Sequence, residues 1–137
     1  MSDLHGFGGN ALAFVVAFVV AGLFTVVFKL IYQWVTPYNE AKLIREGNVA
    51  AALALGGALV GYVLPLASAL SNTVSLVEFC AWAALAGVIQ IAAFTVVRVV
   101  AMKDVSARIE KGEIAAGLYL MSISLAVGLL NAACMTA

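Results

Sequence analysis

The chain is poor in charged residues and in the side chains that enzymes and metal centres use most. Only 10% of its 137 residues are charged, whereas about a quarter of the residues in a soluble domain are charged. It contains a single histidine, and the separation of its two cysteines, Cys80 and Cys134, fits no metal-binding motif. The formal net charge is zero, so the composition does not favour nucleic acid as a partner. These shortages argue against a soluble domain, and they predict no catalytic residues, no metal ligands and no cofactor.

Hydrophobic residues are abundant, at 65% of the chain, and they gather in four long runs. The runs cover roughly residues 10–35, 48–70, 74–101 and 113–134. As a helix, each run could cross a hydrocarbon core of about 30 Å, which takes roughly 20 residues. The runs lack the alternation that is typical of membrane β-barrel strands. The sequence therefore predicts an all-α integral membrane protein, in which residues 1–137 form a single domain of four transmembrane helices in the lipid bilayer.

The basic residues predict how the chain is oriented in the membrane. All seven lie in two groups: Lys29, Lys42 and Arg45, and then Arg98, Lys103, Arg108 and Lys111. Loops rich in Lys and Arg stay preferentially in the cytoplasm. We therefore expect both basic turns inside the cell. Both termini and the connection near Asn72 are expected on the outer, periplasmic side.

The sequence matches itself when it is shifted by 65 residues. Between residues 44–55 and 109–120, six of the twelve aligned pairs are identical. This match predicts two tandem two-helix repeats, at about residues 10–70 and 74–137. Because each repeat holds an even number of spans, the two should be related by a pseudo-twofold axis along the membrane normal.

Each half contains a short charged helical segment that leads into a glycine. Gly47 and Gly112 are expected to adopt the left-handed conformation that ends a helix. Asn48 is then expected to cap the next span through its side chain. Glu113, in the equivalent place, is expected to interact favourably with the helix dipole.

Two stretches near the first turn carry a family resemblance. They are the segment Thr36-Pro37-Tyr38-Asn39-Glu40 and the Gly-Asn-x-Ala-Ala sequence that begins at Gly47. Together they resemble the domain-of-unknown-function 350 family, also called UPF0719. The resemblance covers nearly the whole chain and implies a small, multi-pass bacterial inner-membrane protein without established catalytic residues or ligand. The second half departs from the pattern, since Glu113 replaces Asn48 and Val105 replaces Glu40.

Three polar residues of the spans are candidate functional residues. Thr25 and Gln90 occupy equivalent positions in the two halves, near mid-membrane, and Glu78 lies near the outer start of the third span. Polar groups in hydrocarbon need a partner. Thr25 and Gln90 either form a polar site that contacts water or solute, or they hydrogen-bond between helices. Glu78 is either a cation or proton site or a carboxylate at the level of the headgroups.

Small residues mark the faces on which the helices are expected to pack. Gly57 and Gly61 form a GxxxG motif, and Ser122 and Ala126 keep the same spacing in the second half. Such faces let two helices approach closely. The packing is either within one chain or between subunits.

Two further pairs of residues have an expected place. Tyr32 and Trp34, at the end of the first span, are expected to anchor the chain at the membrane interface. Cys80 and Cys134 both fall near the outer ends of their helices. They are either free thiols that behave as small apolar residues or the two halves of a disulfide.

The residues support two functions of different classes. The first is a non-catalytic, self-associating scaffold or subunit of a membrane complex, which fits the small-residue faces and the lack of a catalytic constellation. The alternative is an oligomeric pore or a small-solute or ion transporter that uses Gln90, Thr25 and Glu78. We expect a homo-oligomer and no enzymatic activity in either case.

Overall fold

The computed structural model describes residues 3–136, with side chains from residue 8 onwards. All regular structure in this range is helical. The elements are α1 (Asp3–Val35), α2 (Glu40–Arg45), α3 (Val49–Asn72), α4 (Leu76–Val96), the π-helix η1 (Val97–Ala101), α5 (Val105–Glu110) and α6 (Ile114–Cys134). The predicted all-α fold is therefore confirmed for residues 3–136.

Within the described residues, four helical stretches are long and apolar enough to cross a membrane. They are Gly8–Val35, Val49–Asn72, Leu76–Ala101 and Ile114–Cys134. They match the four predicted runs closely, and the third joins α4 to η1. The largest difference is at the N-terminus, where α1 begins at Asp3 rather than near residue 10. Glycines interrupt the apolar pattern there, but each costs a helix only about 1 kcal/mol, so the helix continues through them.

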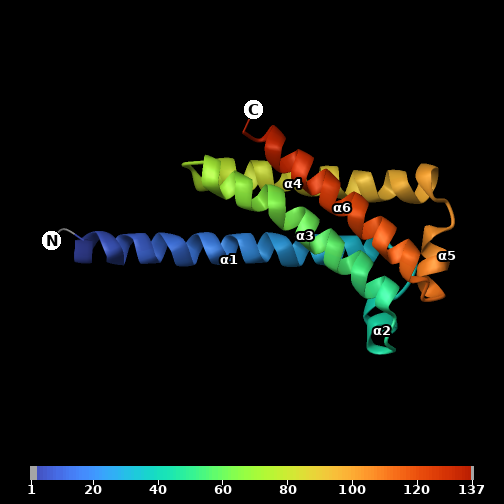
Figure 1. The fold of residues 1–137 in the computed structure, drawn as a ribbon. Coiled ribbons are helices and arrows are strands. Elements are labelled where there is room, and N and C mark those ends of the chain that lie inside the picture. The colour runs from blue at the N-terminus through green and yellow to red at the C-terminus, as the bar shows by residue number, and fades with distance from the viewer. Residues whose placement is uncertain (1–2, 137) are drawn as a thin grey trace.

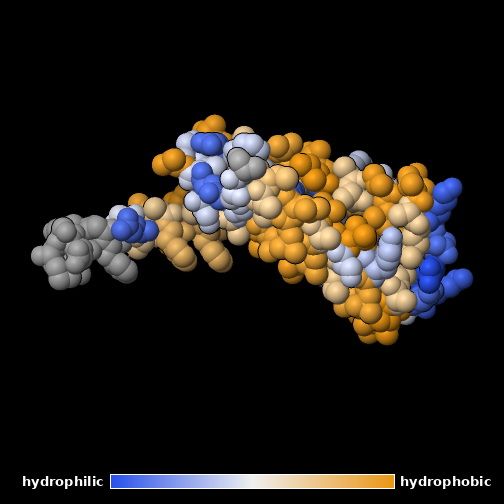
Figure 2. Space-filling view, turned by 45° about the horizontal axis from the view of Figure 1, so that its top comes forward, coloured by the Kyte–Doolittle hydropathy of each residue, from blue (hydrophilic) through white to orange (hydrophobic). Residues whose placement is uncertain are grey.

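The four long helices lie side by side, so that both short helices are at one end of the molecule. Figure 1 shows α2 and α5 at this end, with the α3–α4 connection and the N-terminal end of α1 at the other. In Figure 2, hydrophilic residues gather at the α2–α5 end and in a second patch at the opposite end, and hydrophobic residues cover most of the surface between them. This arrangement is what a chain with two polar turns and an apolar belt needs in a bilayer.

The helices α3 and α6 form the most closely packed pair. Glycines allow the approach, because any larger side chain would meet the neighbouring backbone. A Cβ atom added at Gly57 would lie 2.6 Å from the Cα of Met121, and one at Gly117 would lie 2.7 Å from the Cα of Ala50. The tightest packing is therefore inside the chain, between the second helix of each half.

Pro65 lies inside α3, which continues through it to Asn72. Because proline has no N–H, the carbonyl of Gly61, four residues earlier, lacks its usual helical donor. Gly128 of α6 faces this carbonyl, since a Cβ atom added at Gly128 would collide with the Gly61 oxygen. The two helices thus approach each other where the hydrogen-bond ladder of α3 is interrupted.

The helix α1 is the least buried of the four. Of its most apolar 18-residue window only 6% is buried, against 56% for α3. Its attachment to the other helices runs through aromatic rings. Phe28 stacks on Tyr62 with ring centroids 4.4 Å apart, and the ring of Tyr32 lies 4.9 Å from that of Phe94. These contacts hold the C-terminal half of α1 against α3 and α4.

The two turns share a backbone design. Gly47 and Gly112 adopt the expected left-handed conformation, with φ of 86° and 78°. The Asn48 side chain caps α3 by accepting a hydrogen bond from the backbone N–H of Ala51 at 2.9 Å. Its Nδ2 atom donates to the carbonyl of Ile109 at 2.8 Å, which ties the first turn to the second.

Candidate functional site

The site is built around Glu40, the first residue of α2. Asn39 begins this helix by accepting a hydrogen bond from the backbone N–H of Lys42. The short helix packs against α3, and Glu40 is turned inward, so that only 2% of the residue is exposed. Neither carboxylate oxygen has a hydrogen-bond partner among the described residues. A buried carboxyl group in this condition is unusual, because burial without a partner costs free energy.

Two tyrosines place further hydroxyl groups in the same region. Tyr32 comes from the last turns of α1 and is 1% exposed, and Tyr38 comes from the connection between α1 and α2 and is 9% exposed. Like the Glu40 carboxylate, both hydroxyls are buried and make no hydrogen bond within the described part of the chain. Three segments thus bring these unpartnered oxygen atoms close enough for the Glu40 carboxyl group and the Tyr32 hydroxyl to influence the pKa of Tyr38.

The expectation that Tyr32 anchors the chain at the membrane interface is wrong. Tyr32 is buried, whereas Trp34, two residues later, is 84% exposed. Residues two apart on a helix point to nearly opposite sides. The tyrosine therefore packs among the rings of Phe28 and Phe94, and the tryptophan faces outward.

The electrostatics of the site follow from burial. Loss of solvent raises the pKa of Glu40 to about 8, while the Thr36 hydroxyl and the Lys29 ammonium group act in the opposite direction. Burial also raises the pKa of Tyr38, and the nearby carboxylates of Glu40 and Glu110 add to this effect. Both groups are therefore held in their neutral forms near neutral pH.

Arg98 fixes the end of α1 beside this site. It lies in η1, whose i to i−5 geometry is closed by the bond from the Met102 N–H to the Val97 carbonyl at 2.8 Å. The Arg98 guanidinium donates to the carbonyl of Val35, the last residue of α1, at 2.8 Å. It also lies over the ring of Phe94, 5.7 Å from the centroid. A cation at a helix C-terminus is favourable, so Arg98 stabilises the point at which α1 ends.

The second turn, by contrast, buries none of its carboxyl groups. Val105, the first residue of α5, is fully buried where Glu40 stands in the first turn. Glu113 makes no capping bond; instead it forms an ion pair with Arg108, with 2.9 Å between Arg108 Nε and Glu113 Oε2. The hydrogen bond from Arg108 lowers the pKa of Glu113.

The structure does not bring Thr25 and Gln90 together. Thr25 is half-buried, and its hydroxyl donates to the carbonyl of Ala21 in its own helix at 2.9 Å. Gln90 is buried, and its Nε2 atom donates to the carbonyl of Ser124 in α6 at 3.3 Å. The two polar side chains therefore have separate partners, Thr25 within α1 and Gln90 across the contact of α4 with α6.

Glu78 and the two cysteines lie at less buried positions. Glu78 is exposed in the first turn of α4, where its backbone N–H donates to the Ser75 hydroxyl at 3.2 Å. Cys80 is half-buried and Cys134 is exposed, and both are free thiols. Glu78 therefore lies at the polar edge of its span rather than deep in it.

The small residues split into two groups. Gly57 and Gly61 face α6, as described above, and Gly61 lies against the Ser124 backbone. Ser122 and Ala126 are exposed, and Ser122 donates only to the Leu118 carbonyl of its own helix. The repeat therefore does not identify the packing face of α6, on which Gly117, Ser124 and Gly128 lie instead.

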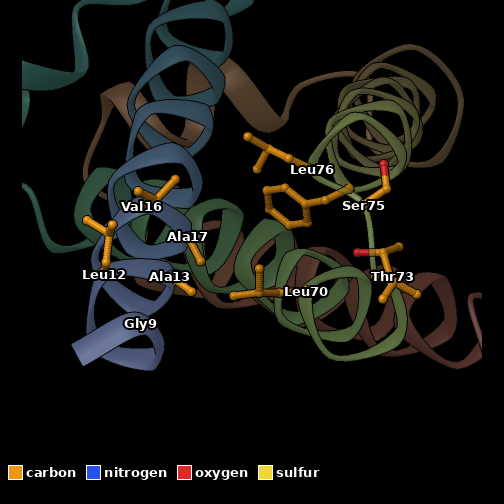
Figure 3. Close-up of a pocket in the computed structure, with 11 residues that line it drawn as sticks. Gly9, Leu12, Ala13, Val16, Ala17, Leu70, Thr73, Ser75 and Leu76 are labelled. Carbon is orange, nitrogen blue, oxygen red and sulfur yellow. The ribbon is translucent and has the colours of Figure 1, made fainter. Parts of the chain in front are cut away.

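Three apolar hollows open beside α1, and Glu40 lines none of them. The first, of about 430 Å³, lies between the N-terminal half of α1 and the α3–α4 connection, with Leu12 and Val16 on one side and Leu70 on the other (Figure 3). The second, of about 530 Å³, lies between α1 and α4 over the ring of Tyr62. The third, of about 390 Å³, lies between α1 and α3 and has Thr25 in its lining. Among the described residues, no group of three or more His, Cys, Asp or Glu side chains could hold a metal ion.

Four apolar helices joined by polar turns define a helical, multi-pass membrane protein. The chain belongs to the family described as Domain of Unknown Function (DUF350), whose model matches residues 3–135. The inner membrane protein YjfL of Escherichia coli strain K12, a UPF0719 protein, is 43% identical over 127 residues, which cover 93% of this chain and 96% of that protein. Its namesake in E. coli O157:H7 gives the same values.

A third relative is more distant. The UPF0719 transmembrane protein YshE of Bacillus subtilis strain 168 is 34% identical over 83 residues, or 60% of each chain. No solved structure matches. The family resemblance is therefore confirmed, and the four apolar helices and the YjfL relatives together support a multi-pass inner membrane protein.

Proposed function

We propose that the protein is a non-catalytic, self-associating scaffold or subunit of the inner membrane. The observation that carries this proposal is the exposure of α1, with 6% of its most apolar window buried. The small-residue face of α3 is occupied by α6 within the chain. The first helix, rather than the GxxxG motif, is therefore the proposed interface.

A second copy of the chain is the proposed partner of α1. The helix has 33 residues, or about 50 Å at 1.5 Å per residue, and its N-terminal end projects beyond the rest of the chain (Figure 1). Phe14 and Phe18 stack along its exposed side with ring centroids 6.3 Å apart. Two copies related by a twofold axis would cover the same residues on both helices.

Cysteine cross-linking in membranes tests this interface. Both native cysteines are first replaced by alanine, and Phe14→Cys or Phe18→Cys is then introduced. Oxidation should give a covalent dimer. Leu129→Cys, at an exposed position of α6, is the matched control and should remain monomeric. If every α1 position stays monomeric in a chain that inserts normally, the proposed interface is wrong.

The proposal includes an internal duplication and an orientation. The duplication is supported by the helix starts, because Glu40 and Val105 begin α2 and α5, and Val49 and Ile114 begin α3 and α6, each pair matching in the 65-residue shift. The orientation places the basic turns in the cytoplasm and both termini in the periplasm. In sealed cells, a cysteine in place of Lys42 should then resist an impermeant thiol reagent.

An oligomeric pore or small-solute transporter is the second candidate. One observation favours it, namely the buried amides between α4 and α6. Gln90 donates to Ser124, and Asn131 donates to the carbonyl of Ala86 at 3.3 Å. Both amides already donate to main-chain carbonyls within one chain. A path for solute would therefore have to run between copies of the chain. Ion flux into liposomes that is lost in Gln90→Leu, with assembly intact, would favour this candidate over the scaffold.

A further inference from the structure

We propose that Glu40, with the hydroxyl groups of Tyr32 and Tyr38, forms a buried proton-binding site at the end of the molecule that carries the basic turns. This inference does not depend on the proposed function, since the site lies away from the exposed side of α1. Its ligand is a single proton, bound by one carboxyl group.

The geometry of the cluster is the first argument. Glu40 is 2% exposed and Tyr32 is 1% exposed, and they come from helices that are separate in the chain. The two carboxylate oxygens and both tyrosine hydroxyls have no hydrogen-bond partner among the described residues. A protonated carboxyl group both donates and accepts, and a phenol does the same. The cluster therefore has the groups needed to hold a neutral acid, and it also has donors for the ionised form.

The second turn provides the second argument. Val105 stands at the position equivalent to Glu40 and is 0% exposed. An apolar side chain thus fills this position in a turn with the same glycine and a helix of the same length. The fold does not need an acid there. Burying one without a salt bridge has a cost that packing does not explain.

The neighbouring charges are the third argument. The ammonium group of Lys29 in α1 lowers the pKa of Glu40. The pKa of Tyr38 is raised by Glu110 in α5 and lowered by Arg98 in η1. The guanidinium of Arg98 is engaged by the Val35 carbonyl and the Phe94 ring. No described basic side chain forms an ion pair with Glu40, since the one salt bridge in residues 8–136 joins Arg108 to Glu113. A proton is then the available means of neutralising the carboxylate.

A proton fits the site better than a metal ion. Ca²⁺ and Mg²⁺ take six or more oxygen ligands, including carboxylates, and Zn²⁺ usually takes four ligands from Cys, His or carboxylate side chains. Here Glu40 is the one carboxylate of the cluster, and the described residues contain no metal-type group. Burial raises the pKa of Glu40 to about 8, so the proton would be exchanged near neutral pH.

Infrared difference spectroscopy tests the proposal on the full-length protein in lipid nanodiscs. The carbonyl stretch of a protonated carboxyl group is recorded while the pH is raised from about 6 to about 10. The wild-type protein should lose such a band with a midpoint near pH 8, and 13C-labelled glutamate should shift it. Glu40→Gln should lack the band. Glu46→Gln, at the end of the same short helix, and Glu78→Gln are matched controls that should keep it.

Further measurements make the outcome decisive. Thr36→Val should move the midpoint to higher pH, because the Thr36 hydroxyl acts to lower the pKa of Glu40. If Glu40→Gln does not fold, Glu40→Val, which copies the second turn, takes its place. The proposal is overturned if the wild-type protein shows no titrating band, or if the band survives both Glu40 substitutions. It is also overturned if the midpoint falls as sodium replaces choline in the buffer, since a metal cation would then be the ligand.

Discussion

The two charged turns of this chain share a backbone and differ in where they place their acidic residues. In the first turn, Glu40 is buried without a partner and Asn48 caps the following helix. In the second, Val105 fills the buried position, and the acid, Glu113, lies near the surface in an ion pair with Arg108. The glycine that ends each short helix is left-handed in both.

This difference separates what the fold requires from what it tolerates. The left-handed glycine is present in both turns because the chain must reverse there. The buried first residue is apolar in one turn and acidic in the other, so its chemistry is not set by the reversal. A feature that departs from its structural counterpart at some energetic cost is a place to look for function.

The largest expected effect comes from making the second turn resemble the first. Val105→Glu would bury a carboxyl group at a fully buried position without the two tyrosine hydroxyls. We expect a loss of about 3 kcal/mol or more of unfolding free energy at neutral pH. Titration with denaturing detergent would measure it. A variant as stable as the wild type would show that the buried acid at Glu40 carries no special cost either.

The reverse exchange, Glu40→Val, should remove a pH dependence. The pKa of Glu40 is raised from 4.5 to about 8 by burial, so between these values the folded protein binds more protons than the unfolded chain. Stability of the wild type should therefore fall as pH rises through this range, by at most about 1.4 kcal/mol per pH unit. The variant should lack this slope, which thermal unfolding at several pH values would show. Equal slopes in both proteins would place the titrating group elsewhere.

Alanine substitution of the glycine that ends each short helix should lower the unfolding free energy by a similar amount in both turns. Gly47→Ala and Gly112→Ala force a side chain into the left-handed region, which costs roughly 1–2 kcal/mol. Gly56→Ala is a control inside α3, where no atom lies within 4 Å of an added Cβ, and it should be neutral or stabilising. If one turn tolerates alanine and the other does not, the common backbone is not equally required in both halves.

The smallest effect is expected at the ion pair of the second turn. Glu113→Gln removes the ion pair with Arg108, which solvent screens. The thermal midpoint should change little, and the difference from wild type should shrink further in high salt. A large, salt-independent loss would mean that Glu113 has a structural role beyond this pair.

Much of the fold could be predicted from the sequence, because its strongest signals are local. Runs of apolar residues identified the four spans, and the spacing of Gly47 and Gly112 located both turns. These signals depend on transfer to lipid and on the backbone conformation of single residues. Neither depends on which helices touch.

The site could not be predicted, because it depends on which face of each helix is covered. The residues of the cluster came to notice for other reasons: Glu40 as part of a family pattern and Tyr32 as an interfacial anchor. Likewise, Thr25 and Gln90 share a depth in the sequence repeat but hydrogen-bond to different helices. The available signal was the valine that aligns with Glu40, which indicated a position that packs inward.

The bond from Asn48 to the Ile109 carbonyl has a consequence for motion. An amide can accept and donate at once, so the Asn48 side chain both caps α3 and binds the end of α5. The carboxylate of Glu113, at the equivalent place in the second turn, has no donor. It therefore cannot make the corresponding bond back to a carbonyl of the first turn. A displacement of the first turn should consequently be transmitted to the second through the bond from Asn48, without passing through the membrane-spanning helices.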